Sequence, residues 1–118
     1  MDISKFQLIN EERAKRWHNG QPQWSLLEWC GAMCGESGEA ANNAKKIKRL
    51  DTSLPNKEAG LDKTNTELLK AKLATEVANS IIYGIIILSE LGVDASQILA
   101  DVYDQKSIEY GFPERAPR

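Results

Sequence analysis

Glu36 and Glu39 are the first side chains in this sequence whose type and spacing could do chemistry together. On a helix, residues three apart are neighbours on one face, so these two carboxylates would lie within several ångströms of each other. Like charges at that spacing repel, and a cation bound between them would remove the repulsion. Gly35 and Gly38 leave space beside the backbone. Close packing could explain the glycines, but it does not explain the carboxylates.

A second pair, Glu76 and Asn79, repeats the spacing further along the chain. Glu76 is the only charged residue between Thr75 and Ser89, and an isolated carboxylate is costly to bury unless it is paired or binds a metal. Lys72, one helical turn earlier, offers the alternative of an ion pair. On facing helices the two pairs would form a site of four oxygen ligands, which suits Mg²⁺ or Mn²⁺ rather than zinc.

The sulfur and imidazole groups give no second candidate metal site. Cys30 and Cys34 are the only cysteines and His18 is the only histidine, too few ligands for zinc. At a spacing of four on a helix, the two thiols are poorly aimed for a disulfide. We expect them to be small, buried apolar groups.

Helices must position these residues. A first helix is expected over about residues 4–17, because the turn-forming residues 18–22 end it. A second helix opens with the capping box Ser25-Leu-Leu-Glu28 and runs to about Arg49. Basic residues in its last turn complement the negative end of the helix dipole.

The second half of the chain predicts two more helices. Residues 51–65 are polar and contain proline and glycine, so they form a loop. A capping box at Thr64 begins the third helix, which Gly92 ends, and Asp94 caps a fourth that runs to about Tyr110. No strand-like alternation of useful length is present. The sequence therefore predicts an all-α fold, a four-helix up-down bundle.

The faces of the two central helices predict how they are buried. The third helix is apolar on nearly every side over Val77–Leu88, which the other three helices can hardly enclose. We expect it to form a homo-oligomeric interface, the alternative being burial within one subunit. On the second helix, Glu36 and Asn43 fall at one edge of an expected apolar stripe. That stripe comprises Leu26, Cys30, Met33, Ser37, Ala41 and Ala44.

Length and composition exclude several classes of protein. The 118 residues fit a single domain over 1–118, and 42% hydrophobic with 27% charged residues argues against disorder. A net charge of −2 lacks the basic surplus of a nucleic-acid binder. The first residues show no signal peptide, and the longest apolar stretch, Ile81–Leu88, is shorter than a membrane span. We expect a cytoplasmic protein without nucleic-acid or membrane partners.

The residues described so far resemble the MazG-type all-α nucleoside triphosphate pyrophosphohydrolases. The resemblance lies in GESGEAA at 35–41, in the lysine pair that follows at 45–46, and in EVANSIIY at 76–83. The family carries Glu-x-x-Glu on one helix and Glu-x-x-Asp on the next. The likeness extends from about Trp17 to Phe112, and the short single-domain phage and integron-cassette members have the closest layout.

The resemblance implies a Mg²⁺-dependent enzyme that hydrolyses a nucleoside triphosphate to the monophosphate and pyrophosphate, in house-cleaning nucleotide metabolism. It makes Glu36, Glu39 and Glu76 metal ligands, with Asn79 at the position of the usual aspartate. Glu36 or Glu39 would also be catalytic by accepting a proton from the attacking water. Mn²⁺ could replace Mg²⁺.

The resemblance also implies residues that bind the substrate. Relatives hold the base with aromatic and polar groups, and lysines at the end of the second helix could steady the phosphates. Core packing is the alternative for each tryptophan, and a solvated helix end is the alternative for the lysines. The expected substrate-binding set is Trp24, Trp29, Asn43, Lys46 and Tyr83.

Asn79 leaves a second function open. An amide keeps an oxygen ligand but removes one negative charge from the site. The chain could therefore be a catalytically weakened nucleotide-binding or helical interaction module. A third hypothesis, a purely structural oligomer, is disfavoured by the glutamate within the apolar third helix. The expected partners are a nucleoside triphosphate and further copies of the chain, as a homodimer or a dimer of dimers.

Overall fold

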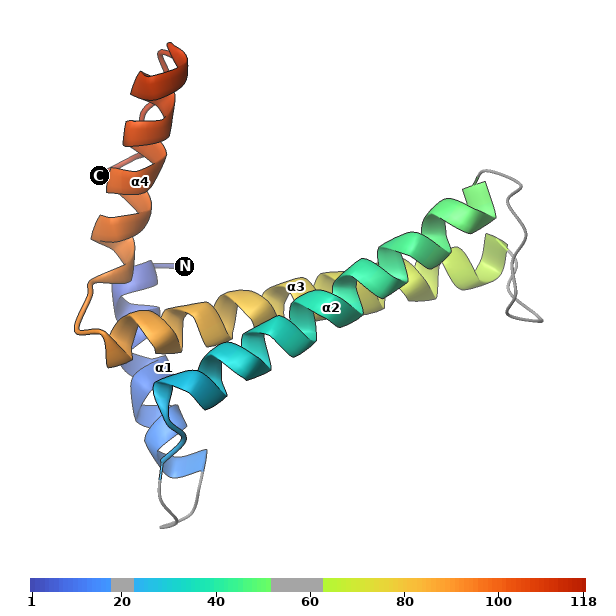
Figure 1. Ribbon diagram of the computed structural model, residues 1–118, viewed down its shortest axis with the longest axis horizontal. Coiled ribbons are helices and arrows are strands. Elements are labelled where there is room, and N and C mark those ends of the chain that lie inside the picture. Colours follow the sequence, from blue (N-terminus) through green and yellow to red (C-terminus); the bar gives the residue numbers. More distant parts are fainter. Residues whose placement is uncertain (18–22, 52–62) are drawn as a thin grey trace. The chain divides into compact units, whose positions relative to one another are not determined.

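The computed structural model describes residues 1–17, 23–51 and 63–118, and its regular structure is entirely α-helical (Figure 1). No strand occurs in these ranges. The all-α prediction is therefore confirmed, and its helices lie close to the expected ranges. They are α1 (Ile3–Trp17), α2 (Leu26–Asp51), α3 (Lys63–Glu90) and α4 (Ala95–Tyr110).

The predicted boundaries of α4 are confirmed by local capping contacts. The Asp94 side chain accepts a hydrogen bond from the Gln97 backbone N–H at 2.8 Å, which satisfies a free donor of the first turn. At the other end Gly111 has φ +76°, a left-handed conformation that glycine adopts without steric cost. Its N–H and that of Phe112 donate to carbonyls of the last turn at 3.2 and 2.8 Å, which ends the helix.

α3, like α4, ends at a glycine in the left-handed conformation, and its start differs slightly from the prediction. Gly92 has φ +70° and ends α3 as expected. The helix begins at Lys63, so Thr64 lies within it rather than capping it. α2 likewise includes Asp51, so the expected 51–65 loop is shorter at both ends. Its remaining residues, 52–62, and the expected turn at 18–22 lie outside the described residues.

The chain divides into two compact units. One comprises Leu27–Gly84, and the other joins Met1–Leu26 to Ile85–Arg118. In the first, α2 and α3 form an antiparallel hairpin (Figure 1). Polar contacts between the two helices fix its register: Ser37 with Ser80, and Asn43 with Glu76, so residue number falls on α3 as it rises on α2.

In the second unit a buried glutamine on α1 holds the turn between α3 and α4. Gln7 is 7% exposed. Its Nε2 donates to the Val93 carbonyl at 2.8 Å and to Ser89 Oγ at 3.3 Å, while its Oε1 accepts from the Ala95 N–H at 2.8 Å. Because Ala95 is fully buried, that N–H has no access to water and needs this partner.

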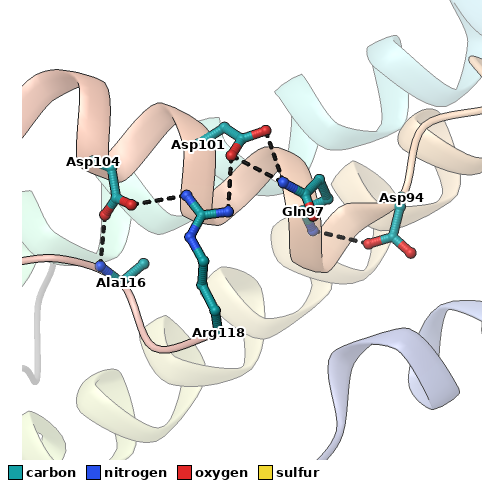
Figure 2. Close-up of polar contacts among 6 residues, drawn as sticks. All are labelled: Asp94, Gln97, Asp101, Asp104, Ala116 and Arg118. Carbon is teal, nitrogen blue, oxygen red and sulfur yellow. Dashed lines mark hydrogen bonds and ion pairs between the residues drawn. The ribbon is translucent and has the colours of Figure 1, made fainter.

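The segment after α4 folds back onto the same helix (Figure 2). Arg118 forms ion pairs with Asp101 at 3.0 Å and with Asp104 at 2.8 Å. Asp104 also accepts a hydrogen bond from the Ala116 N–H, and Asp101 accepts from Gln97. These bonds lower the pKa of both carboxyls: the bond from Gln97 is the main cause at Asp101, and the bond from Arg118 is the main cause at Asp104.

The apolar helix α3 is only partly covered within one chain. Ile85 and Ile86 are each 5% exposed, but Val77 is 44% and Ile81 is 58% exposed. The homo-oligomeric interface and its alternative, burial within one subunit, both stay predictions. Among the described residues, one segment, Thr66–Glu90, is long and apolar enough to cross a membrane by length and composition. Of its most apolar stretch of 18 residues, 11% is buried.

Candidate functional site

The face of α2 that meets α3 carries polar as well as apolar residues. Trp29, Ala40 and Asn43 are buried on it, and Met33 and Glu36 between them are half-buried. Their spacing of three and four residues is that of one helical stripe. Of the stripe predicted from the sequence, Cys30 and Met33 are half-buried. The prediction is wrong for the other four residues, which are exposed: Leu26, Ser37, Ala41 and Ala44.

The α2-facing stripe of α3 includes Glu76. Leu69 is buried at one end of this stripe, and Glu76, Ser80 and Tyr83 are half-buried along it. Contacts to α2 are made by Glu76 through Asn43, by Ser80 through Ser37, and by Tyr83. The expectation that a carboxylate lies off the solvated face of this helix is therefore confirmed.

Glu76 is held by an amide rather than by a cation. Asn43, 8% exposed, donates from Nδ2 to Glu76 Oε2 at 2.8 Å. Within the described ranges, no ion pair joins Lys72 to Glu76, and Glu76 Oε1 makes no hydrogen bond. The alternative of an ion pair from Lys72 is therefore not what the structure contains.

The hairpin register determines how the four predicted ligands are distributed. Ser37–Ser80 and Asn43–Glu76 set Glu39 at about the level of Asn79, with Glu36 and Glu76 about one turn, roughly 5 Å, to either side. From Glu36 to Glu39, and from Glu76 to Asn79, each helix turns by the same angle. In an antiparallel pair this rotation leads to the same side of the hairpin.

The side chains are not gathered into a closed cluster. Glu36 and Asn79 are half-buried, and Glu39 is exposed. Among the residues that the structure describes, no three His, Cys, Asp or Glu side chains lie close enough together to hold a metal ion. The donor set nevertheless has the right chemistry, because carboxylate and amide oxygens without sulfur or imidazole are what Mg²⁺ prefers.

Two of the aromatic residues expected to bind substrate, Trp29 and Tyr83, pack against each other. Trp29 is 3% exposed, and its ring centroid lies 6.0 Å from that of Tyr83 at an interplanar angle of 40°. A ring buried to this extent has no face free for a nucleobase, so the structure favours the packing alternative for Trp29. Trp24 is half-buried but belongs to the other compact unit.

Lys46, the lysine expected to hold the phosphates, is half-buried near the end of α2.

Cys30 is half-buried and Cys34 is exposed, and both are free thiols. The expectation that both are buried is therefore wrong for Cys34. Its position explains the error: Cys34 lies about 100° around α2 from Met33 and away from the stripe that meets α3. His18 lies outside the described residues.

Comparisons with known proteins give no match. No family model matches the sequence, no curated protein matches it, and no solved structure matches the fold. The residues and contacts of the α2–α3 hairpin must therefore support any assignment of function.

Proposed function

We propose that the chain is a MazG-type, Mg²⁺-dependent nucleoside triphosphate pyrophosphohydrolase of house-cleaning nucleotide metabolism. The observation that carries the proposal is the state of Glu76. It is a half-buried carboxylate and the only charged residue between Thr75 and Ser89. Among the described residues it has no cationic partner, and one of its oxygens makes no hydrogen bond. Such a group is costly to keep unless it has a ligand.

The surrounding residues supply what the proposed reaction needs. Mg²⁺, held by Glu36, Glu39, Glu76 and Asn79, would neutralise the charge of the triphosphate. Glu39 is exposed, so it can take the proton of a water as the new oxygen–phosphorus bond forms and the anhydride bond to pyrophosphate breaks. Lys46 lies on the same side of α2 as Glu39 and can hold phosphate oxygens.

A second candidate function is nucleotide binding with weakened catalysis. It is favoured by two observations on this chain. Asn79 brings no charge to the site, and no three carboxylates gather in the described part of a single chain. Binding could persist in such a site, because the phosphates themselves would complete the coordination of the cation.

We further propose that the four helices belong to an up-down bundle completed by a second copy of the chain, as a homodimer or dimer of dimers. What supports this proposal is that Val77 and Ile81, one turn apart on α3, are exposed and offer apolar area to a second copy. Lipid is a poor candidate for that surface, because Glu76 and Asn79 lie in the middle of the same helix and would be costly in hydrocarbon. We therefore propose a cytoplasmic oligomer.

The test is a panel of ribo- and deoxyribonucleoside triphosphates with Mg²⁺, assayed separately for pyrophosphate and orthophosphate. Pyrophosphate release from at least one member is expected, and Glu39→Gln or Glu76→Gln should reduce it to background, because each removes a charged ligand. Glu90→Gln, an exposed glutamate at the end of the same helix α3, is the matched control and should leave the rate unchanged.

Two results would contradict the proposal. Orthophosphate as the sole inorganic product would overturn the reaction, and full activity in excess EDTA would overturn the role of the metal. Nucleotide binding without hydrolysis in the unchanged protein would select the second candidate.

A further inference from the structure

Asn43 is in an unusual position for a residue that binds substrate. It is 8% exposed and lies in the stripe of α2 that meets α3, so its amide is enclosed by the hairpin. Its Nδ2 is committed to Glu76 Oε2 at 2.8 Å. The Asn43 amide therefore acts directly on the Glu76 carboxylate, and on a bound substrate only through Glu76.

The chemistry of this bond suits the preparation of a metal ligand. An amide donor holds one oxygen of a carboxylate in place and restricts rotation of the group, but it leaves the negative charge intact. A lysine in its place would neutralise that charge. The other oxygen, Glu76 Oε1, makes no hydrogen bond in the described chain and is left for a ligand.

We propose that Asn43 is a positioning residue: its amide orients Glu76 so that Oε1 faces a divalent cation. This inference rests on the proposed function, because it assumes that Glu76 is a metal ligand. It differs from the substrate-binding role that the sequence suggested for Asn43, since the contact runs through Glu76 and requires no nucleotide.

The hairpin contains its own control for a purely structural role. Ser37 Oγ and Ser80 Oγ lie 3.2 Å apart and form a second polar contact between α2 and α3, one in which no carboxylate takes part. If Asn43 only joined the two helices, removal of either contact would change Mn²⁺ binding to the same extent. If Asn43 positions Glu76, only its own removal changes cation binding.

The test measures Mn²⁺ binding by electron paramagnetic resonance in the full chain without nucleotide. Asn43→Leu keeps the shape of the side chain but removes the donor, and we expect it to weaken Mn²⁺ binding by roughly tenfold or more, as outer ligand partners do elsewhere. Ser37→Ala should leave the affinity within about twofold of the unchanged protein. Asn43→Gln retains the donor and should bind Mn²⁺ more tightly than Asn43→Met, which has the same length without a donor. This second pair also decides the question if the leucine variant does not fold.

The possible outcomes separate this inference from the proposed function. Equal Mn²⁺ affinity in the unchanged protein and in the donor-free variants overturns the inference alone, as does an equal loss in Ser37→Ala. An affinity that depends on Asn43, in a protein that releases no pyrophosphate, supports the inference and overturns the proposed reaction. No Mn²⁺ binding by the unchanged protein overturns both.

Discussion

The residue that most affects the proposed site is Asn79. It is half-buried on α3, about level with Glu39 in the hairpin register. The MazG-type pattern, which the sequence resembles, has an aspartate at this position. The Asn79 amide offers one oxygen to a cation and one NH₂ group that would repel it. A site with three carboxylates and an amide binds a hard cation more weakly than a site with four carboxylates.

At this scale we predict that Asn79→Asp increases the rate of pyrophosphate release. The Mg²⁺ concentration for half-maximal rate should fall by on the order of tenfold, because the added charge attracts the cation directly. Titration of the rate with Mg²⁺ measures both effects. Gln105→Glu adds the same charge at an exposed position of α4 and should change neither value. An unchanged or lower rate in Asn79→Asp would show that residue 79 is not a ligand.

At the scale of the elements, the sequence predicted what is decided locally and failed where distant residues compete. Asp94, Gly92 and Gly111 act on their own helix ends, so their types indicate where α3 and α4 stop and start. The buried stripe of α2 differs from the predicted one because a prediction from apolar residues assumes that polar residues face water. Asn43 is buried because Glu76, 33 residues away, accepts its hydrogen bond. No local pattern contains that partner.

The contacts of the segment after α4 with Asp101 and Asp104 predict that the folded chain loses stability in acid. The pKa values of Asp101 and Asp104 are lowered in the folded chain, so their bonds stabilise it fully above the ordinary carboxyl pKa of about 4 and progressively less as the pH falls through the lowered values. Arg118→Gln should raise the pKa of Asp104 more than that of Asp101. The reason is that Arg118 is the main cause at Asp104, whereas Gln97 is the main cause at Asp101.

Carbon-detected NMR titration of the aspartate carboxyls between about pH 2 and 6 measures these pKa values. Lys106→Gln removes a basic side chain of α4 itself, one that pairs with Glu109, and should leave the pKa of both aspartates unchanged. Equal pKa values in Arg118→Gln and in the unchanged protein would show that the contacts in Figure 2 do not form in solution.

At the scale of the whole molecule, substitutions on α3 can test folding and assembly separately, because some of its apolar residues are buried and others are exposed. Ile85 and Ile86 are buried within one chain, so a charge at either would disrupt the fold whether or not the protein is an oligomer. Val77 and Ile81 are exposed in the chain and are the positions at which an interface can be tested separately.

We predict that Ile81→Lys converts the proposed oligomer to a monomer of about the chain mass, 13.2 kDa, without loss of helical content. Burial of an isoleucine contributes about 1.5–3 kcal/mol, and a symmetric interface loses it in both copies. Light scattering at micromolar concentration and circular dichroism measure the two properties. Leu8→Lys, at a comparably exposed position of α1, should leave the mass unchanged. A mass of about 13 kDa for the unchanged protein would contradict the proposed assembly.

The contacts of Gln7 have a consequence for the order in which the protein can fold during synthesis. Its partners Ser89, Val93 and Ala95 lie 82 to 88 residues further along the chain. The α2–α3 hairpin, by contrast, is continuous in sequence and can form as soon as Gly84 has left the ribosome. α1 is translated before this hairpin, but the partners of Gln7 exist only after the hairpin has been made. Contacts between residues so far apart in sequence form slowly, so α1 is made before the hairpin and reaches its final contacts after it.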